Sequence, residues 1–155
     1  MTEVIRGLIR NLNFKEAFDE INEMPTVDLG MILVEMAHEK SDIRPYTFVL
    51  SLIAKDPENS KWHYLASLLL SQPLCRLAGA YETSYYHAQR AELLSPEDMS
   101  LKEYLLFFYI IPDRLLDDRE AIRISQAILE NDANNQTALS TLVEHEKRTG
   151  FSLPR

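Results

Sequence analysis

Glu35 and His38 form a Glu-x-x-His pair, the spacing in this chain that comes nearest to a metal-ligand motif. Residues three positions apart share one face of a helix. Di-iron carboxylate bundles use this spacing, but they need two such pairs and two further glutamates. The chain holds no second Glu-x-x-His sequence. A solvated helix face is therefore the preferred interpretation, and we predict no metal and no cofactor.

Cys75 is the single cysteine of the chain, so no internal disulfide is expected. A nucleophilic cysteine needs an activated thiolate and a nearby base, and no histidine lies close to Cys75 in sequence. No glycine-rich phosphate loop, paired-carboxylate motif or zinc spacing occurs either. We predict a small core thiol and no enzymatic activity. An α-helical enzyme centred on His38, His63 and Cys75 is kept as an alternative.

An aromatic run, Tyr81 to His87, includes Tyr81 and Tyr85 four positions apart. Residues at this spacing share a helix face, so packing against a neighbouring helix is preferred over a binding hot spot. Aromatic residues that bind nucleic acid alternate with basic ones. Only Arg76 and Arg90 are near this run. The sequence therefore gives no indication of nucleic-acid binding.

The elements that must position these residues are all helical. Nine segments carry apolar residues at helical spacing, and no segment of useful length alternates as a strand would. The prediction is an all-α protein of about nine helices, with spans that include residues 2–10, 26–40, 60–72, 76–94 and 99–111. Expected helix starts are Asn13 with Glu16, Thr26, Ser95 with Pro96, Asp117 with Glu120, and Asn134 or Asn135, and Gly150 ends the last helix.

Similar turns recur along the chain at Pro25, Pro57, Pro96 and Ala133, with separations of 32, 39 and 37 residues. Each turn follows an apolar helix end and precedes a polar helix start. Such a unit is a helical hairpin that buries its apolar face only by stacking on its neighbours.

The segment Asp56-Pro57-Glu58-Asn59, followed by Trp62, Leu65 and Ala66, resembles the tetratricopeptide repeat (TPR) superfamily. Ala88, Ala91 and Pro96 fit the second half of that repeat, and Ala121, Ile128 and Asp132-Ala133-Asn134-Asn135 look like a weaker copy. Trp62 comes one residue early, and the two central units exceed the usual 34 residues. The resemblance implies a right-handed superhelix of antiparallel hairpins in a single domain, residues 1–155. Its parts would be a first hairpin 1–24, units 25–57, 57–96 and 96–133, a capping helix 134–149 and a tail 150–155.

The TPR resemblance also implies that the first helix of each hairpin lines a concave surface where a partner docks. Carried over position by position, it predicts that the partner-binding residues are Glu35, His38, His63, Ser67, Lys102, Tyr109 and Glu144. Of these, Glu35 and Glu144 are expected to be exposed. Trp62 is expected in the core, from its spacing with Leu65 and Leu69.

The formal net charge is −8, and each half of the chain carries −4. This disfavours nucleic acid and anionic membranes and favours a basic protein partner. No apolar stretch reaches the roughly 18 residues of a membrane span, and the N-terminus lacks a signal-peptide pattern. We expect a cytoplasmic, non-catalytic protein-protein interaction module: an adaptor, a chaperone, or an immunity protein that neutralises a basic toxin. A structural homo-oligomer paired through the nearly all-apolar helix 99–111 is a further alternative.

Overall fold

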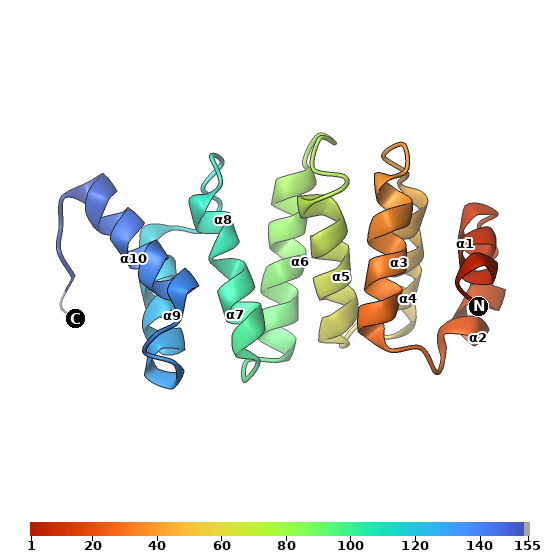
Figure 1. Cartoon of the computed structure of the whole chain (residues 1–155), viewed down its shortest axis with the longest axis horizontal. Coiled ribbons are helices and arrows are strands. Elements are labelled where there is room, and N and C mark those ends of the chain that lie inside the picture. Colours follow the sequence, from red (N-terminus) through yellow and green to blue (C-terminus); the bar gives the residue numbers. More distant parts are fainter. Residues whose placement is uncertain (154–155) are drawn as a thin grey trace. The chain divides into compact units, whose positions relative to one another are not determined.

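The computed structural model describes residues 1–153, and all the regular structure in that range is helical. Helices α7 and α8 are separated only by Leu106, so the described chain has nine helices, one of them interrupted, as the sequence predicts (Figure 1). Of the predicted tail, residues 154–155 lie outside the described range. The segments are α1 (Thr2–Arg10), α2 (Phe14–Ile21), α3 (Thr26–His38), α4 (Arg44–Lys55), α5 (Ser60–Ser71), α6 (Ala80–Leu94), α7 (Met99–Leu105), α8 (Phe107–Ile110), α9 (Asp118–Asn131) and α10 (Gln136–Thr149).

The chain forms two compact units, Met1–Leu94 with α1 to α6 and Ser95–Arg155 with α7 to α10. In the first unit, consecutive helices pack as pairs, and α3 also contacts α1 and α5. A continuous apolar core runs through it from Ile5 to Ala80, with Phe48 and Leu69 among its buried residues. In the second unit, α7 and α10 both pack on α9.

Three turns of the same construction precede α5, α7 and α10. In each, the amide of the fourth residue donates to the carbonyl of the first: Asn59 to Asp56, Asp98 to Ser95, and Asn135 to Asp132. The side chain of the fourth residue then accepts from an amide of the next helix. Such caps satisfy backbone donors that the first helical turn leaves free. The predicted turns at residues 57, 96 and 133 therefore share one geometry, even though Ala133 replaces proline.

Three predicted helix starts are wrong in detail. Ser95 does not cap α7, because Asp98 accepts from the Ser100 amide at 2.9 Å and the helix begins at Met99. Thr26 is the first residue of α3 rather than its cap, since Pro25 takes the cap position with an extended ψ of 137°. Asn13 precedes α2 without a side-chain cap bond. The predicted caps Asp117 and Asn135, and the left-handed Gly150 at the end of α10, are confirmed.

The sixth helix starts later than residue 76. Gly79 adopts a left-handed φ of 75°, and α6 begins immediately after it at Ala80. Glycine reaches this conformation without a Cβ penalty, whereas it weakens a helix interior by about 1 kcal/mol. The residues from Gln72 to Gly79 therefore form an irregular connection between α5 and α6.

The buried face of α10 is not the one that carries its large apolar residues, Leu139, Leu142 and Val143. The structure buries Ala138, Thr141 and His145 instead, and leaves Val143 exposed. Polar side chains can be buried when they have partners. Thr141 donates to the Thr137 carbonyl and His145 meets the Tyr109 hydroxyl. Hydrophobicity alone places both residues on the wrong side.

Candidate functional site

A groove of about 720 Å³ lies between α3 and α5 in the first unit. Its walls come from the first helices of two successive pairs, α3–α4 and α5–α6, whose connecting turns lie on the same side of the unit (Figure 1). Large apolar side chains stay at the surface here: Val27 is 74% exposed and Met31 is 56% exposed. The lining residues are Pro25, Thr26, Val27, Gly30, Met31, Val34, Lys61, Tyr64, Leu65, Leu68 and Gln72.

Gly30 sets how closely α3 approaches α5 at the floor of the groove. A Cβ atom at this position would lie 3.0 Å from Leu65 Cδ2, which is closer than ordinary carbon packing of about 3.5–4.0 Å. Glycine therefore permits this approach. The larger side chains on either side of it, Val27, Met31 and Val34, then form the wall of the groove.

Lys61 is the one charged residue among those that line the groove. It is exposed, stands in the first turn of α5, and makes no ion pair with any residue in the described range. The nearby Asp56 carboxylate accepts from the Asn59 side chain at 3.0 Å. Helix starts carry partial positive charge, and α3 begins without a side-chain cap. Lys61 is therefore the one formal charge on the groove lining at this end, and Asp28 lies outside the lining in the first turn of α3.

The second unit has a groove of about 600 Å³ between α7–α8 and α10. One wall is aromatic and aliphatic, with Tyr104 and Phe107 stacked 6.4 Å apart and Ile110 61% exposed. The other wall carries hydroxyl and amide groups of α10, including Ser140. Glu103 bridges the walls, because it accepts from Thr137 Oγ1 at 2.6 Å and from the Asn135 side chain at 3.2 Å.

Four of the seven predicted partner-binding residues are buried: His63, Ser67, Lys102 and Tyr109. Buried side chains cannot contact a surface partner directly. The groove residues on the same helices lie one position later in sequence, namely Tyr64 and Leu68 on α5, Glu103 on α7 and Ile110 on α8. The early position of Trp62 marked this shift of one residue in α5. Trp62 itself is half-buried and packs against the core.

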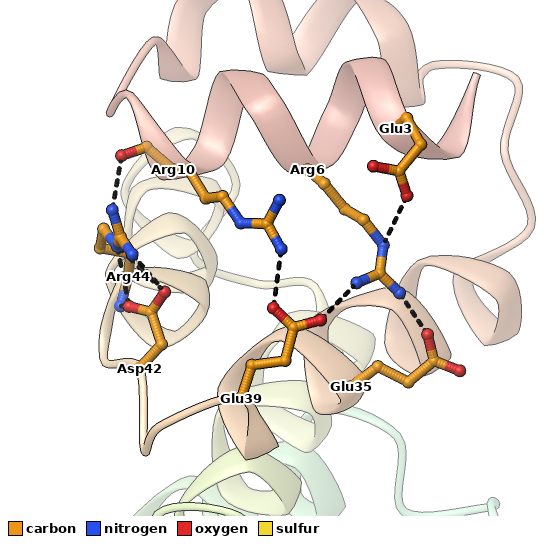
Figure 2. A network of polar contacts seen from close by, with 7 residues as sticks. All are labelled: Glu3, Arg6, Arg10, Glu35, Glu39, Asp42 and Arg44. Carbon is orange, nitrogen blue, oxygen red and sulfur yellow. Dashed lines mark hydrogen bonds and ion pairs between the residues drawn. The ribbon is translucent and has the colours of Figure 1, made fainter.

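The other three predicted residues, Glu35, His38 and Glu144, are at least partly exposed. Glu35 does not point into the groove: it joins a charged network between α1 and α3 (Figure 2). The largely buried Arg6 pairs with both Glu35 and Glu39, and its Nε lies 3.5 Å from Glu3 Oε1. Arg10 adds a contact of 2.7 Å to Glu39. Glu144 lies 4.0 Å from Arg114.

A chain of hydrogen bonds links α4, α5 and α6 through two buried histidines. His63 Nε2 lies 3.2 Å from the Pro57 carbonyl, which can only accept, so this nitrogen carries the proton. The bare His63 Nδ1 then accepts from His87 Nδ1 at 3.1 Å, and His87 Nε2 accepts from the Tyr46 hydroxyl at 3.2 Å. With these tautomers, every member of the chain has a partner while both rings stay neutral. Burial lowers the pKa of His87 to about 4, helped by its proximity to His63, and burial also lowers the pKa of His63.

A second polar cluster joins α10 to α8 and α9. The Tyr109 hydroxyl receives a bond of 2.6 Å from Arg148 and lies 3.3 Å from His145 Nδ1. Arg148 also pairs with Asp118. Burial raises the pKa of Tyr109, so the environment favours its neutral phenol over a reactive phenolate. The cluster holds the last helix onto its unit.

The residues that could form a catalytic or metal site are not brought together. His63 pairs with His87 rather than with His38 or Cys75, and Cys75 is a free thiol of intermediate exposure. No group of three or more histidine, cysteine, aspartate or glutamate side chains in the described range could hold a metal ion. Residues 1–153 also contain no helix long and apolar enough to span a membrane.

No protein-family model matches this sequence, and no curated protein matches it significantly. The sequence did carry an indication of the groove. Val27, Met31 and Val34 form a second apolar stripe on α3, beside the inward stripe of Leu29 and Leu33. A helix with two apolar stripes needs cover on two sides.

Proposed function

We propose that this chain is a non-catalytic protein-binding module and that the α3–α5 groove is its recognition surface. The exposed apolar wall of the groove, above all Val27 and Met31, carries the proposal. Apolar side chains gathered in a surface hollow are typical of interaction sites, and methionine adapts its shape to a partner. Helix-in-groove recognition uses a surface of this kind.

We further propose that the helices stack as TPR-like hairpins. The identical turns before α5, α7 and α10 support this arrangement. So does the position of the grooves, because in each unit a groove lies between helices that begin successive hairpins.

Within the class of binding modules, the charge favours a basic partner. A net charge of −8 attracts a basic protein before contact and raises the association rate, an effect that salt screens beyond about 10 Å at 0.1 M. An immunity protein that neutralises a basic toxin is one form of the hypothesis that fits this charge, beside an adaptor or a chaperone. A single cysteine agrees with a reducing compartment such as the cytoplasm.

The test is selection from a random peptide display library on the immobilised protein. Met31→Glu introduces a charge into the groove at a side chain that is 56% exposed, and Leu93→Glu makes the same kind of change on α6 at a side chain that is 64% exposed. We expect selected peptides to bind the unaltered protein and Leu93→Glu but to lose at least ten-fold in affinity for Met31→Glu. Peptides that bind Met31→Glu as well as the unaltered protein would contradict the assignment of the groove.

A further inference from the structure

We propose that the α3–α5 groove binds an amphipathic helix of a partner protein, and that this helix places an acidic side chain beside Lys61. The inference rests on the proposed function of the groove and adds the conformation and local charge of what it binds.

The length of the groove suits a short helix. Its lining runs over residues 25–34, from the N-cap of α3 into that helix, and over residues 61–72, along α5 to its C-cap. At 1.5 Å per helical residue, these spans are about 14 and 17 Å, or roughly three turns of a docked helix. Apolar side chains at i, i+3, i+4 and i+7 of that helix would face Val27, Met31 and Leu68 together.

The chemistry of the walls favours a helix over an extended strand. An extended peptide has backbone groups that need hydrogen-bond partners wherever water is excluded. Both walls are helices, whose interior backbone groups are already bonded to one another. The polar side chains that line the groove are few, namely Thr26, Lys61, Tyr64 and Gln72. A docked helix satisfies its own backbone and needs only apolar contacts from these walls.

Lys61 selects the charge at one end of the docked helix. It is the one charged lining residue, it has no ion-pair partner in the described range, and it stands where α3 and α5 both begin. The two helix starts add partial positive charge, which Asp28 in the first turn of α3 offsets in part. An acidic side chain at this position gains a partner, whereas a basic one is repelled. Net charge acts on the whole partner at a distance, so a basic protein can still present such a helix.

The experiment uses two fluorescein-labelled synthetic peptides of 14 residues with the same leucine face. One carries glutamate at both ends of that face and the other carries lysine, so the orientation of docking does not matter. Affinities are measured by fluorescence polarisation at physiological salt for the unaltered protein, Lys61→Glu and Lys15→Glu. Lys15 is an exposed lysine of α2, so its reversal changes the net charge equally without touching the groove.

We expect the preference for the glutamate peptide over the lysine peptide to fall about five-fold in Lys61→Glu, as the loss and reversal of an exposed ion pair imply. The preference should stay unchanged in Lys15→Glu. Equal changes in both variants, or none in either, would overturn the role of Lys61. The groove itself would still stand if Met31→Glu abolished binding of both peptides. Binding that survives Met31→Glu would contradict the proposed function, and failure of both peptides to bind at millimolar concentration would overturn the helix proposal.

Discussion

Besides its hairpin partner α4, helix α3 has two neighbours, α1 and α5, and these two junctions are built in opposite ways. Toward α1, the junction is closed by charge: Arg6 is largely buried and pairs with Glu35 and Glu39 (Figure 2). Toward α5, the helices approach closely at Gly30 and Leu65, but an apolar groove stays open at the surface of this contact, where Met31 is 56% exposed. A junction whose polar groups satisfy each other has little left for a partner. An open apolar junction leaves exposed apolar side chains that a partner can cover, which is why the groove carries the proposed function.

The charged junction is also tied at its edge. Arg44 donates from Nη1 to the carbonyl of Arg10 at 2.8 Å, so α4 holds the end of α1. The guanidinium meets Asp42 in a two-point contact, with Nε 2.8 Å from Oδ1 and Nη2 2.7 Å from Oδ2. The pKa of Asp42 is lowered, chiefly by this hydrogen bond to Arg44. Paired geometry of this kind is stronger than a single exposed ion pair.

The largest effect should come from Arg6→Ala. The Arg6 side chain is 11% exposed, so its loss removes packing as well as pairing. It leaves Glu35 without its partner and leaves Glu39 with Arg10 alone. Breaking a buried pair costs about 3–5 kcal/mol, and the exposure of both glutamates reduces this to about 2–3 kcal/mol. Urea unfolding measures the change. A loss below 1 kcal/mol would mean that apolar packing, not charge, holds the α1–α3 junction.

Acid should weaken the first unit by about 2 kcal/mol between pH 7 and pH 5. The folded pKa of His87 is about 4, below the value of about 6.5 for an unfolded histidine. Between these values the unfolded chain binds more protons, so stability is present above pH 6.5 and is lost as the pH falls. Urea unfolding across this range should show a flatter profile for His87→Gln, whereas His38→Gln, at an exposed position, should leave the profile unchanged. Identical profiles in all three proteins would contradict the neutral hydrogen-bond chain.

The fold could be predicted further than the site. Prolines and caps give nine helices, since these signals act within a few residues. The site depends on which face of each helix is buried. On α5, the predicted exposed face is shifted by one residue, because Ser67 is buried and hydrogen-bonded to Ser84. Its hydroxyl donates to the Ser84 carbonyl at 2.8 Å, a contact between residues 17 positions apart. Sequence spacing does not reveal a buried polar pair of this kind.

Charge reversal provides a direct comparison of the two junctions. Glu35→Lys places a second cation beside the buried Arg6 and should cost about 1 kcal/mol, even though the Glu35 side chain is 66% exposed. Lys61→Glu removes no ion pair and should change the free energy of unfolding by less than 0.5 kcal/mol, as is typical of surface substitutions. Parallel urea melts of the two variants make the measurement. Equal losses would show that both junctions depend on charge.

A small gain in stability is expected at the end of α1. Leu12 has a left-handed φ of 60° and an exposed side chain, and the amide of Asn13 donates to the Leu8 carbonyl as in a helix-ending motif. Leu12→Gly should relieve the strain of this conformation and stabilise the protein by about 0.5–1 kcal/mol in thermal or urea melts. A loss of stability would mean that the side chain of Leu12 contributes packing that outweighs the strain.

The central claim is that the α3–α5 junction receives the partner, and the methionine methyl groups report on it directly. The chain has five methionines. Met31 lines the groove, Met36 is buried on the same helix, and Met99 lies in the second unit. In a sample labelled with ¹³C at the methionine methyl groups, and assigned by Met31→Leu, the glutamate peptide is titrated by NMR. We predict that the Met31 signal shifts progressively to saturation while Met99 stays in place. A saturating shift at Met99 with Met31 unmoved would contradict the assignment of the groove.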